Sequence, residues 1–118
     1  MASAEQLTRD VLLPLFPRRV FADQVDGNVP PPYAVFQAVG GVDETTFDGL
    51  SDVQNSRMQV TVWTASRLEA AELMQGVLKV MTAGPVRAKP LGAPVSVRDI
   101  ETGFRGSRVD FSIWFRPA

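Results

Sequence analysis

The sequence predicts an α+β fold, in which an antiparallel sheet of four strands, or slightly more, carries a helix on one face. Residues 57–64 and 106–116 alternate between apolar and polar side chains, as half-buried strands do. Between these segments, residues 68–81 place apolar side chains at helical spacing. The expected order of elements is α-β-β-α-β-β, in a single domain of residues 1–118.

The N-terminal helix is expected to begin after Ser3. Ser3 and Gln6 stand three residues apart and form a capping box, in which the Ser3 hydroxyl accepts from the Gln6 amide. Pro14 excludes a long helix, so the helix should end near Leu13. Residues 20–21 are expected to form a short strand.

The next strand is expected over residues 33–39, which are rich in β-branched and aromatic side chains and stop at two glycines. The polar residues 43–56 then predict a long loop, a kind of segment that is often functional. No helix separates 33–39 from 57–64, so these two strands should pair antiparallel.

A second helix is expected after Ser66, where Ser66 and Glu69 form another capping box. Gly84 and Pro85 predict its end through C-cap chemistry. The apolar residues at helical spacing that should face the sheet are Leu68, Ala71, Met74, Val77, Leu78 and Met81.

The C-terminal part of the chain predicts a connection followed by a hairpin. Residues 87–92 contain Pro and Gly and are expected to form the connection. Residues 95–101 alternate weakly, and a turn signal at Thr102-Gly103 joins them to the strand 106–116. We therefore expect the last two strands to be antiparallel neighbours.

Composition excludes several kinds of chemistry. The chain has no Cys and no His, and its 12 basic and 13 acidic side chains give a net charge of −1. Disulfides, thiol nucleophiles, imidazole bases and Cys- or His-ligated metals are therefore excluded. A charge near zero argues against sequence-independent nucleic-acid binding. We expect no enzymatic activity and no cofactor.

No segment of the sequence predicts a membrane partner. The apolar run 11–16 is far shorter than the ~20 residues that span a bilayer. Residues 1–5 lack the basic and apolar regions of a signal peptide. We therefore expect the chain to be in the cytoplasm where it is made.

Carboxylates and two apolar residues share the predicted loop. The carboxylates are Asp43, Glu44, Asp48 and Asp52. Their spacing does not match a calcium-binding loop of the EF-hand kind, so a solvated loop is the favoured interpretation. Phe47 and Leu50 either anchor a partner or fold back onto the domain's own core.

The net charge hides two segments of opposite sign. Residues 20–56 contain six acidic and no basic side chains, whereas residues 57–118 contain nine basic and five acidic ones. Opposite charges on different segments suit head-to-tail association, which closes into a ring when the rotation permits. The alternative is that folding brings the two segments together and cancels the charges.

The polar sides of the predicted strands carry two further signals. Trp63 and Trp114 lie on these sides, so either a partner subunit or the first helix should cover them. Three arginines lie on or beside the last strand and either form ion pairs with Asp99, Glu101 and Asp110 or make a subunit contact: Arg105, Arg108 and Arg116.

Taken together, the ordered motifs resemble the tail completion (tail terminator) proteins of bacteriophages with long non-contractile tails. The motifs are Pro32-Tyr33-Ala34-Val35-Phe36-Gln37 before Gly40, Thr46-Phe47-Asp48-Gly49, Arg57-Met58-Gln59-Val60-Thr61-Val62-Trp63, Ala70-Ala71-Glu72-Leu73-Met74, Glu101-Thr102-Gly103-Phe104-Arg105 after Asp99, and Arg108-Val109-Asp110-Phe111-Ser112-Ile113-Trp114-Phe115-Arg116. The resemblance extends from the first helix to Pro117.

This resemblance implies a structural virion protein. It would form a ring, typically a hexamer, at the head-proximal end of the tail tube, where it stops tube polymerisation and offers a surface to head connector proteins. Its partners would be further copies of itself, the tail tube protein and the connector proteins. DNA would pass through the ring without specific binding, no cofactor is implied, and assembly would take place in the host cytoplasm.

Two sets of interface residues follow as expectations. The loop set, which would contact the tube or a neighbouring protomer, is Asp43, Glu44, Thr46, Phe47, Asp48, Leu50 and Asp52. The protomer–protomer set is Arg57, Trp63, Phe104, Arg105, Arg108 and Trp114. Two alternatives stay open, namely another head–tail connector (neck) protein and a non-viral oligomeric α+β binding module.

Overall fold

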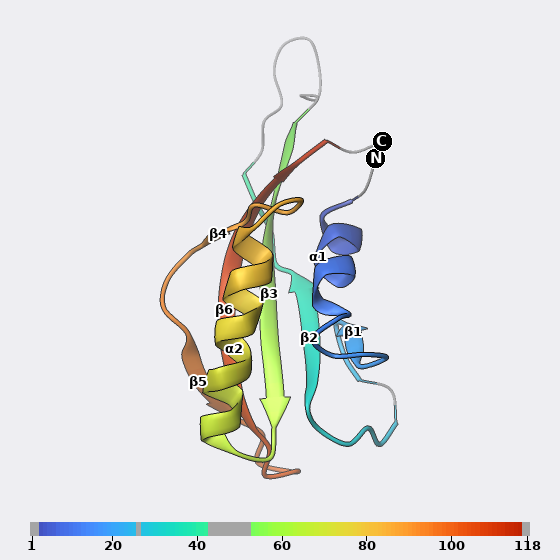
Figure 1. Ribbon diagram of the computed structural model, residues 1–118, viewed down its shortest axis with the longest axis vertical. Coiled ribbons are helices and arrows are strands. Elements are labelled where there is room, and N and C mark those ends of the chain that lie inside the picture. The colour runs from blue at the N-terminus through green and yellow to red at the C-terminus, as the bar shows by residue number, and fades with distance from the viewer. Residues whose placement is uncertain (1–2, 26, 43–52, 117–118) are drawn as a thin grey trace.

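The computed structural model describes residues 3–25, 27–42 and 53–116 (Figure 1). The elements are α1 (Ala4–Leu12), β1 (Val20–Ala22), β2 (Tyr33–Ala38), β3 (Gln54–Thr64), α2 (Arg67–Thr82), β4 (Lys89–Pro90), β5 (Val95–Arg98) and β6 (Arg105–Phe115). The α+β class is confirmed, and the expected order of elements is matched in part.

The six strands form one mixed sheet, which is larger than expected and not purely antiparallel. The strand order is β1-β2-β3-β6, and β4 and β5 both pair with β6. All neighbours are antiparallel except β1 and β2, which are parallel. The reason is that residues 23–32 return the chain to the beginning of β2 instead of making the tight turn that a hairpin needs.

The centre of the sheet is the antiparallel pair of β3 and β6. Their ladder extends from Gln54 opposite Phe115 to Thr64 opposite Arg105. β3 therefore begins inside the segment that the sequence predicted as loop, because residues 54–56 pair with the end of β6. β4 also replaces part of the expected connection 87–92, and its Pro90 lies at the edge of the sheet, where a missing N–H is tolerated.

Both helices pack on the same face of the sheet, which holds the core (Figure 1). The predicted alternation of β3 and β6 is confirmed, because alternate side chains from Ser56 to Thr64 and from Ser107 to Ile113 are buried on the helix side of the sheet. The buried side chains from the two central strands and the helices include Leu12, Met58, Val60, Val62, Met74, Val77, Met81, Val109, Phe111 and Ile113. On α2, however, Leu68 and Ala71 are exposed, contrary to prediction.

The helices begin and end close to the predicted residues, but the capping interactions are only partly as predicted. The Ser3 hydroxyl accepts from the Gln6 amide at 3.1 Å, as expected. Ser66 is the N-cap of α2, but its side chain makes no capping hydrogen bond, and its own amide donates to the Thr64 hydroxyl. α2 ends where predicted, with Ala83 in extended conformation and no left-handed glycine cap at Gly84.

Candidate functional site

The face of the sheet opposite the helices, hereafter the open face, is covered by neither helix (Figure 1). The odd-numbered residues of β3 and the even-numbered residues of β6 lie on it, because the core takes the alternate ones. The first helix therefore does not cover Trp63 and Trp114, which corrects that alternative. Trp63 is half-buried, and Trp114 is 50% exposed.

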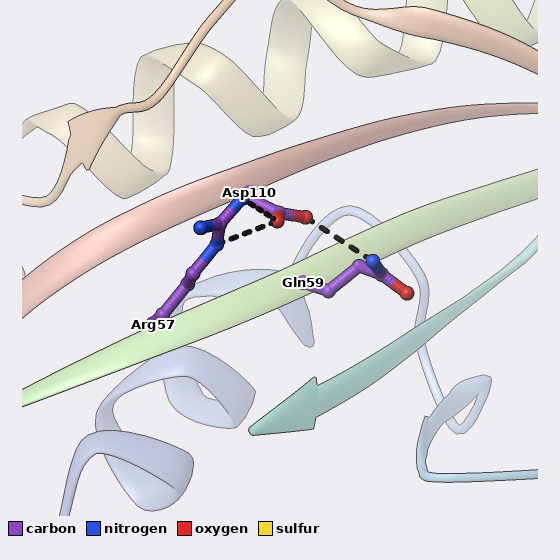
Figure 2. A network of polar contacts seen from close by, with 3 residues as sticks. All are labelled: Arg57, Gln59 and Asp110. Atoms are coloured by element: carbon purple, nitrogen blue, oxygen red, sulfur yellow. Dashed lines mark hydrogen bonds and ion pairs between the residues drawn. The ribbon is translucent and has the colours of Figure 1, made fainter. Parts of the chain in front are cut away.

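A polar network ties β3 to β6 on the open face (Figure 2). Arg57 donates from Nε to Asp110 Oδ2 at 2.8 Å, and its Nη2 lies 2.7 Å from the same oxygen. Gln59 donates from Nε2 to Asp110 Oδ1 at 3.2 Å. Gln59 is directly opposite Asp110 and Arg57 is diagonal to it, so the sheet register places all three together.

Asn55 lies at the end of the open face where β3 begins, and it links β3 to two neighbouring segments. Its Nδ2 donates to Ser112 Oγ at 2.8 Å, and its Oδ1 accepts from the Val42 amide at 3.0 Å. Gly41 passes so close that a Cβ there would lie 2.3 Å from the Asn55 carbonyl oxygen. Trp114 lies opposite Asn55 in the register and is one of the most exposed aromatic side chains described.

Arg108 occupies the middle of the open face, between Thr61 of β3 and Val95 of β5. Its Nε is buried and has no hydrogen-bond partner within the described part of the chain. A buried guanidinium nitrogen without an acceptor is costly, since its hydration is lost without replacement. Arg108 therefore has a buried N–H whose acceptor is not provided by the described residues.

A groove of about 720 Å³ lies at the other end of the open face. We call it the acidic aromatic groove, and its principal walls are Asp23, Tyr33, Trp63, Asp99 and Phe104. The Tyr33 ring meets the Phe104 ring edge to face, with centroids 6.3 Å apart. Burial, and secondarily the charge of Asp99, raises the pKa of the Tyr33 hydroxyl above 10.0.

Gly106 forms the floor beneath Trp63, which it faces across the β3–β6 ladder. A Cβ on Gly106 would lie 2.9 Å from Trp63 Cε3 and 2.8 Å from Val97 Cγ2. Only the absence of a side chain lets the indole lie against the β6 backbone here. The groove thus depends on a glycine that carries no chemistry of its own.

Four of the six residues predicted for the protomer interface lie on the open face. A fifth, Phe104, lies in the groove at the end of that face. Trp63 and Phe104 line the acidic aromatic groove, whereas Arg57, Arg108 and Trp114 occupy the remainder of the face. Arg105 is the exception, because it lies opposite the buried Thr64 on the helix side of the sheet. The predicted loop set lies outside the described residues.

The predicted ion pairs of the last strand are corrected. Among the described residues the ion pair is between Arg57 and Asp110, and none joins Arg105, Arg108 or Arg116 to an acid. Sequence reasoning also did not single out Asn55, Gln59 or Tyr33 as site residues. The alternation of β3 placed Gln59 on this face, but its partner could be found only once β6 was known to be the neighbour.

The described residues hold no cluster of three acidic side chains arranged to bind a metal ion. No helix in the described part of the chain combines the length and the apolar character needed to cross a membrane.

An α+β chain with a hollowed, uncovered sheet face and an exposed tryptophan offers a surface of the kind that marks protein contacts. The sequence model of one family, the tail completion protein gp17, matches residues 6–116. The chain belongs to this family. It is a structural protein of phage tail completion and a component of the virion, as the resemblance predicted.

Two solved structures share the fold. A chain in the virion of a native gene transfer agent (GTA) particle superposes with a TM-score of 0.62 at 14% identity, over 98% of this chain and 92% of that one. The bacteriophage SPP1 gp17 protein superposes with a TM-score of 0.57 at 21% identity, over 96% and 88% of the two chains. No curated protein matches the chain in sequence.

Proposed function

We propose that the protein assembles into a ring of six copies that caps the head-proximal end of the tail tube. The ring ends tube polymerisation and provides the surface on which head connector proteins are joined. The observation that carries this proposal is the open face, which holds an exposed Trp114 and an Arg108 whose Nε has no acceptor among the described residues.

A subunit contact supplies what the open face lacks. Interface cores are enriched in aromatic residues and arginine, and both are present on this face. A neighbouring protomer would cover Trp114 and bring an acceptor to Arg108, and both changes favour association. Membership of a tail completion family favours this role over a non-viral binding module.

The remaining partners are part of the proposal. The tail tube protein meets one rim of the ring, and the loop set from Asp43 to Asp52 stays our prediction for that contact or for the neighbouring protomer. The connector proteins meet the other rim, and DNA passes through the ring without specific binding. The ring assembles in the host cytoplasm, has no cofactor and catalyses no reaction.

The proposal is tested by mixing the purified protein with its tail tube protein during tube polymerisation. We expect tubes of limited length, each with a closed ring at one end in negative-stain images, and a defined oligomer by light scattering. Tubes whose length is independent of the protein would contradict the proposal. Binding to the connector protein without binding to tubes would replace it by the neck-protein role.

A further inference from the structure

Three arginines gather on the helix side of the sheet, where α2 begins. Arg67, Arg98 and Arg105 line a cleft of about 200 Å³ between α2 and β5. Arg98 and Arg105 are directly opposite each other across the β5–β6 ladder. We call these three residues the arginine cluster.

The arginine cluster is unfavourable in an isolated protomer. Like charges directly opposite in a sheet repel each other, and no acid of the described residues forms an ion pair with any of the three. The N-terminus of α2 adds a partial positive charge at Arg67. The arrangement therefore favours a partner that brings carboxylates.

An exposed apolar side chain accompanies the cluster. Leu68, next to Arg67 in the first turn of α2, is 78% exposed, whereas Met74, Val77 and Met81 of the same helix are buried. A cation beside an exposed leucine fits a groove that combines carboxylates with apolar walls. The cluster is thus amphipathic and is not a purely electrostatic patch.

The acidic aromatic groove has the complementary chemistry. Asp23 and Asp99 contribute two carboxylates, and no basic residue is among its lining residues. Neither carboxylate forms an ion pair with a described basic residue. The rings of Tyr33, Trp63 and Phe104 supply apolar walls on which guanidinium groups also stack favourably.

The two patches lie on opposite faces of the sheet but at the same end of the molecule. The segment from β5 to β6 contributes to both, with Arg98 and Arg105 on the helix side and Asp99 and Phe104 on the groove side. In Figure 1 this end holds the start of α2 and the arrowhead of β3. A closed ring requires that successive copies are not displaced along the ring axis. Two patches at the same height along the long axis of the molecule allow a head-to-tail contact without such a displacement.

We propose that the arginine cluster of each protomer, with Leu68, docks into the acidic aromatic groove of the next copy of this chain. Arg67, Arg98 and Arg105 thereby meet Asp23 and Asp99, and Leu68 contacts the aromatic walls. This inference rests on the proposed ring and specifies the part of its heterologous contact that lies at the groove end of the open face.

The test uses reciprocal charge reversal. R98E/R105E makes the cluster acidic, and D23K/D99K makes the groove basic, so each variant alone places like charges at every contact. We expect each to lose the ring when it is incubated with tail tubes. An equimolar mixture can alternate the two variants around a ring, which gives opposite charges at every contact, and we expect it to restore the ring.

Control variants carry the same charge changes elsewhere. R9E/K79E and D10K/E72K alter exposed residues of the two helices outside both patches, and we expect each to form rings as the wild type does. Circular dichroism and urea unfolding check that every variant is folded. Should a reversal variant be unfolded, the neutral pairs R98Q/R105Q and D23N/D99N replace it, and we expect each to need about tenfold more protein for ring formation.

The outcomes separate this contact from the proposed function. A wild-type ring that the folded reversal variants leave intact, or a mixture that does not recover, overturns the pairing alone. A wild-type protein that forms no ring on tubes contradicts the proposed function. If wild-type protein retains a DNA fragment at physiological salt and R98E/R105E does not, the cluster is a nucleic-acid site and the pairing is overturned.

Discussion

Gly106 determines where Trp63 lies. Gly106→Ala would place a Cβ within 3.0 Å of Trp63, Val97 and the Val62 carbonyl oxygen, and these neighbours are too confined to yield easily. We expect the substitution to lower the free energy of unfolding by about 1–3 kcal/mol, as overpacking does. Urea unfolding measures the loss, and Trp63 fluorescence in a Trp114→Phe background should shift to longer wavelength.

Gly76→Ala in α2 is the matched control. A Cβ at Gly76 would make only ordinary contact with Leu15, 3.6 Å from Cδ1, and alanine is the better helix former. We expect a gain of about 0.5–1 kcal/mol. If both glycines tolerated alanine equally, the close packing of Trp63 on Gly106 would not be a determinant of stability.

The raised pKa of Tyr33 predicts that the protein loses stability at high pH. Its folded-state pKa lies above the ordinary value of 10.0, chiefly through burial and then through the charge of Asp99. The folded state therefore holds this proton more tightly than the unfolded chain does. Stability from this group is fully present below pH 10 and is lost as pH rises from there through the folded-state pKa.

Tyr33→Phe removes the titrating hydroxyl and keeps the ring. We expect the wild type to lose stability more steeply than Tyr33→Phe above pH 10 and the two to respond alike between pH 6 and 9. Urea unfolding over this pH range gives the comparison. Parallel curves above pH 10 would show that Tyr33 ionises equally easily in the folded and unfolded states.

Site features that depend on local sequence were predictable, whereas contacts between residues far apart in the sequence were not. Alternation alone correctly predicted that Trp63 and Trp114 share a face, because side-chain direction in a strand has a period of two. It could not identify Asp110 as the partner of Arg57, since that contact depends on which strand lies next to β3 and in what register. For the same reason it could not exclude α1 as the cover of that face.

The two helix N-termini give a direct comparison between similar motifs. Ser3 caps α1 through its side chain, whereas the Ser66 side chain makes no capping hydrogen bond. We expect Ser3→Ala to lower the free energy of unfolding by about 1 kcal/mol and Ser66→Ala to change it by less than about 0.5 kcal/mol. Urea unfolding of the two variants measures the difference.

Thr64→Val tests the hydrogen bond that holds the residue just before α2. The Thr64 hydroxyl is fully buried and accepts from the Ser66 amide, so valine would leave that amide without its partner. We expect a loss of about 1–3 kcal/mol, larger than for Ser66→Ala. Equal effects of the two substitutions would argue that solvent satisfies the start of α2.

Elements with long, regular periods were predictable, and short ones were not. α2 and β6 each extend over more than ten residues, so their periodicity fixed both type and orientation. β4 has two residues and no period, and it exists only because the edge of β6 is available to pair with it. The parallel pairing of β1 likewise depends on the path of residues 23–32, which local sequence does not determine.

At the scale of the whole molecule, the charge polarity predicted from the sequence is partly retained after folding. The ion pair of the described residues joins Arg57 and Asp110, which both belong to the basic segment 57–118. Asp23, of the acidic segment, keeps its place in the acidic aromatic groove without a basic neighbour in the groove lining. Folding of the described residues therefore does not cancel the two segments against each other, and charge complementarity remains available for assembly.

Arg108→Met separates the stability of the protomer from its assembly. Methionine keeps most of the side-chain length and removes the buried Nε that has no described acceptor. We expect the free energy of unfolding to stay equal or rise by up to about 1 kcal/mol, while ring formation on tubes is lost because the neighbour's acceptor has no cation to meet.

Lys79→Met, on the exposed side of α2, controls for the loss of one positive charge and should retain the ring. Urea unfolding and negative-stain imaging of the same samples give both readouts. A destabilised Arg108→Met protomer would mean that Arg108 acts within its own chain, and an intact ring would mean that the middle of the open face is not at the contact.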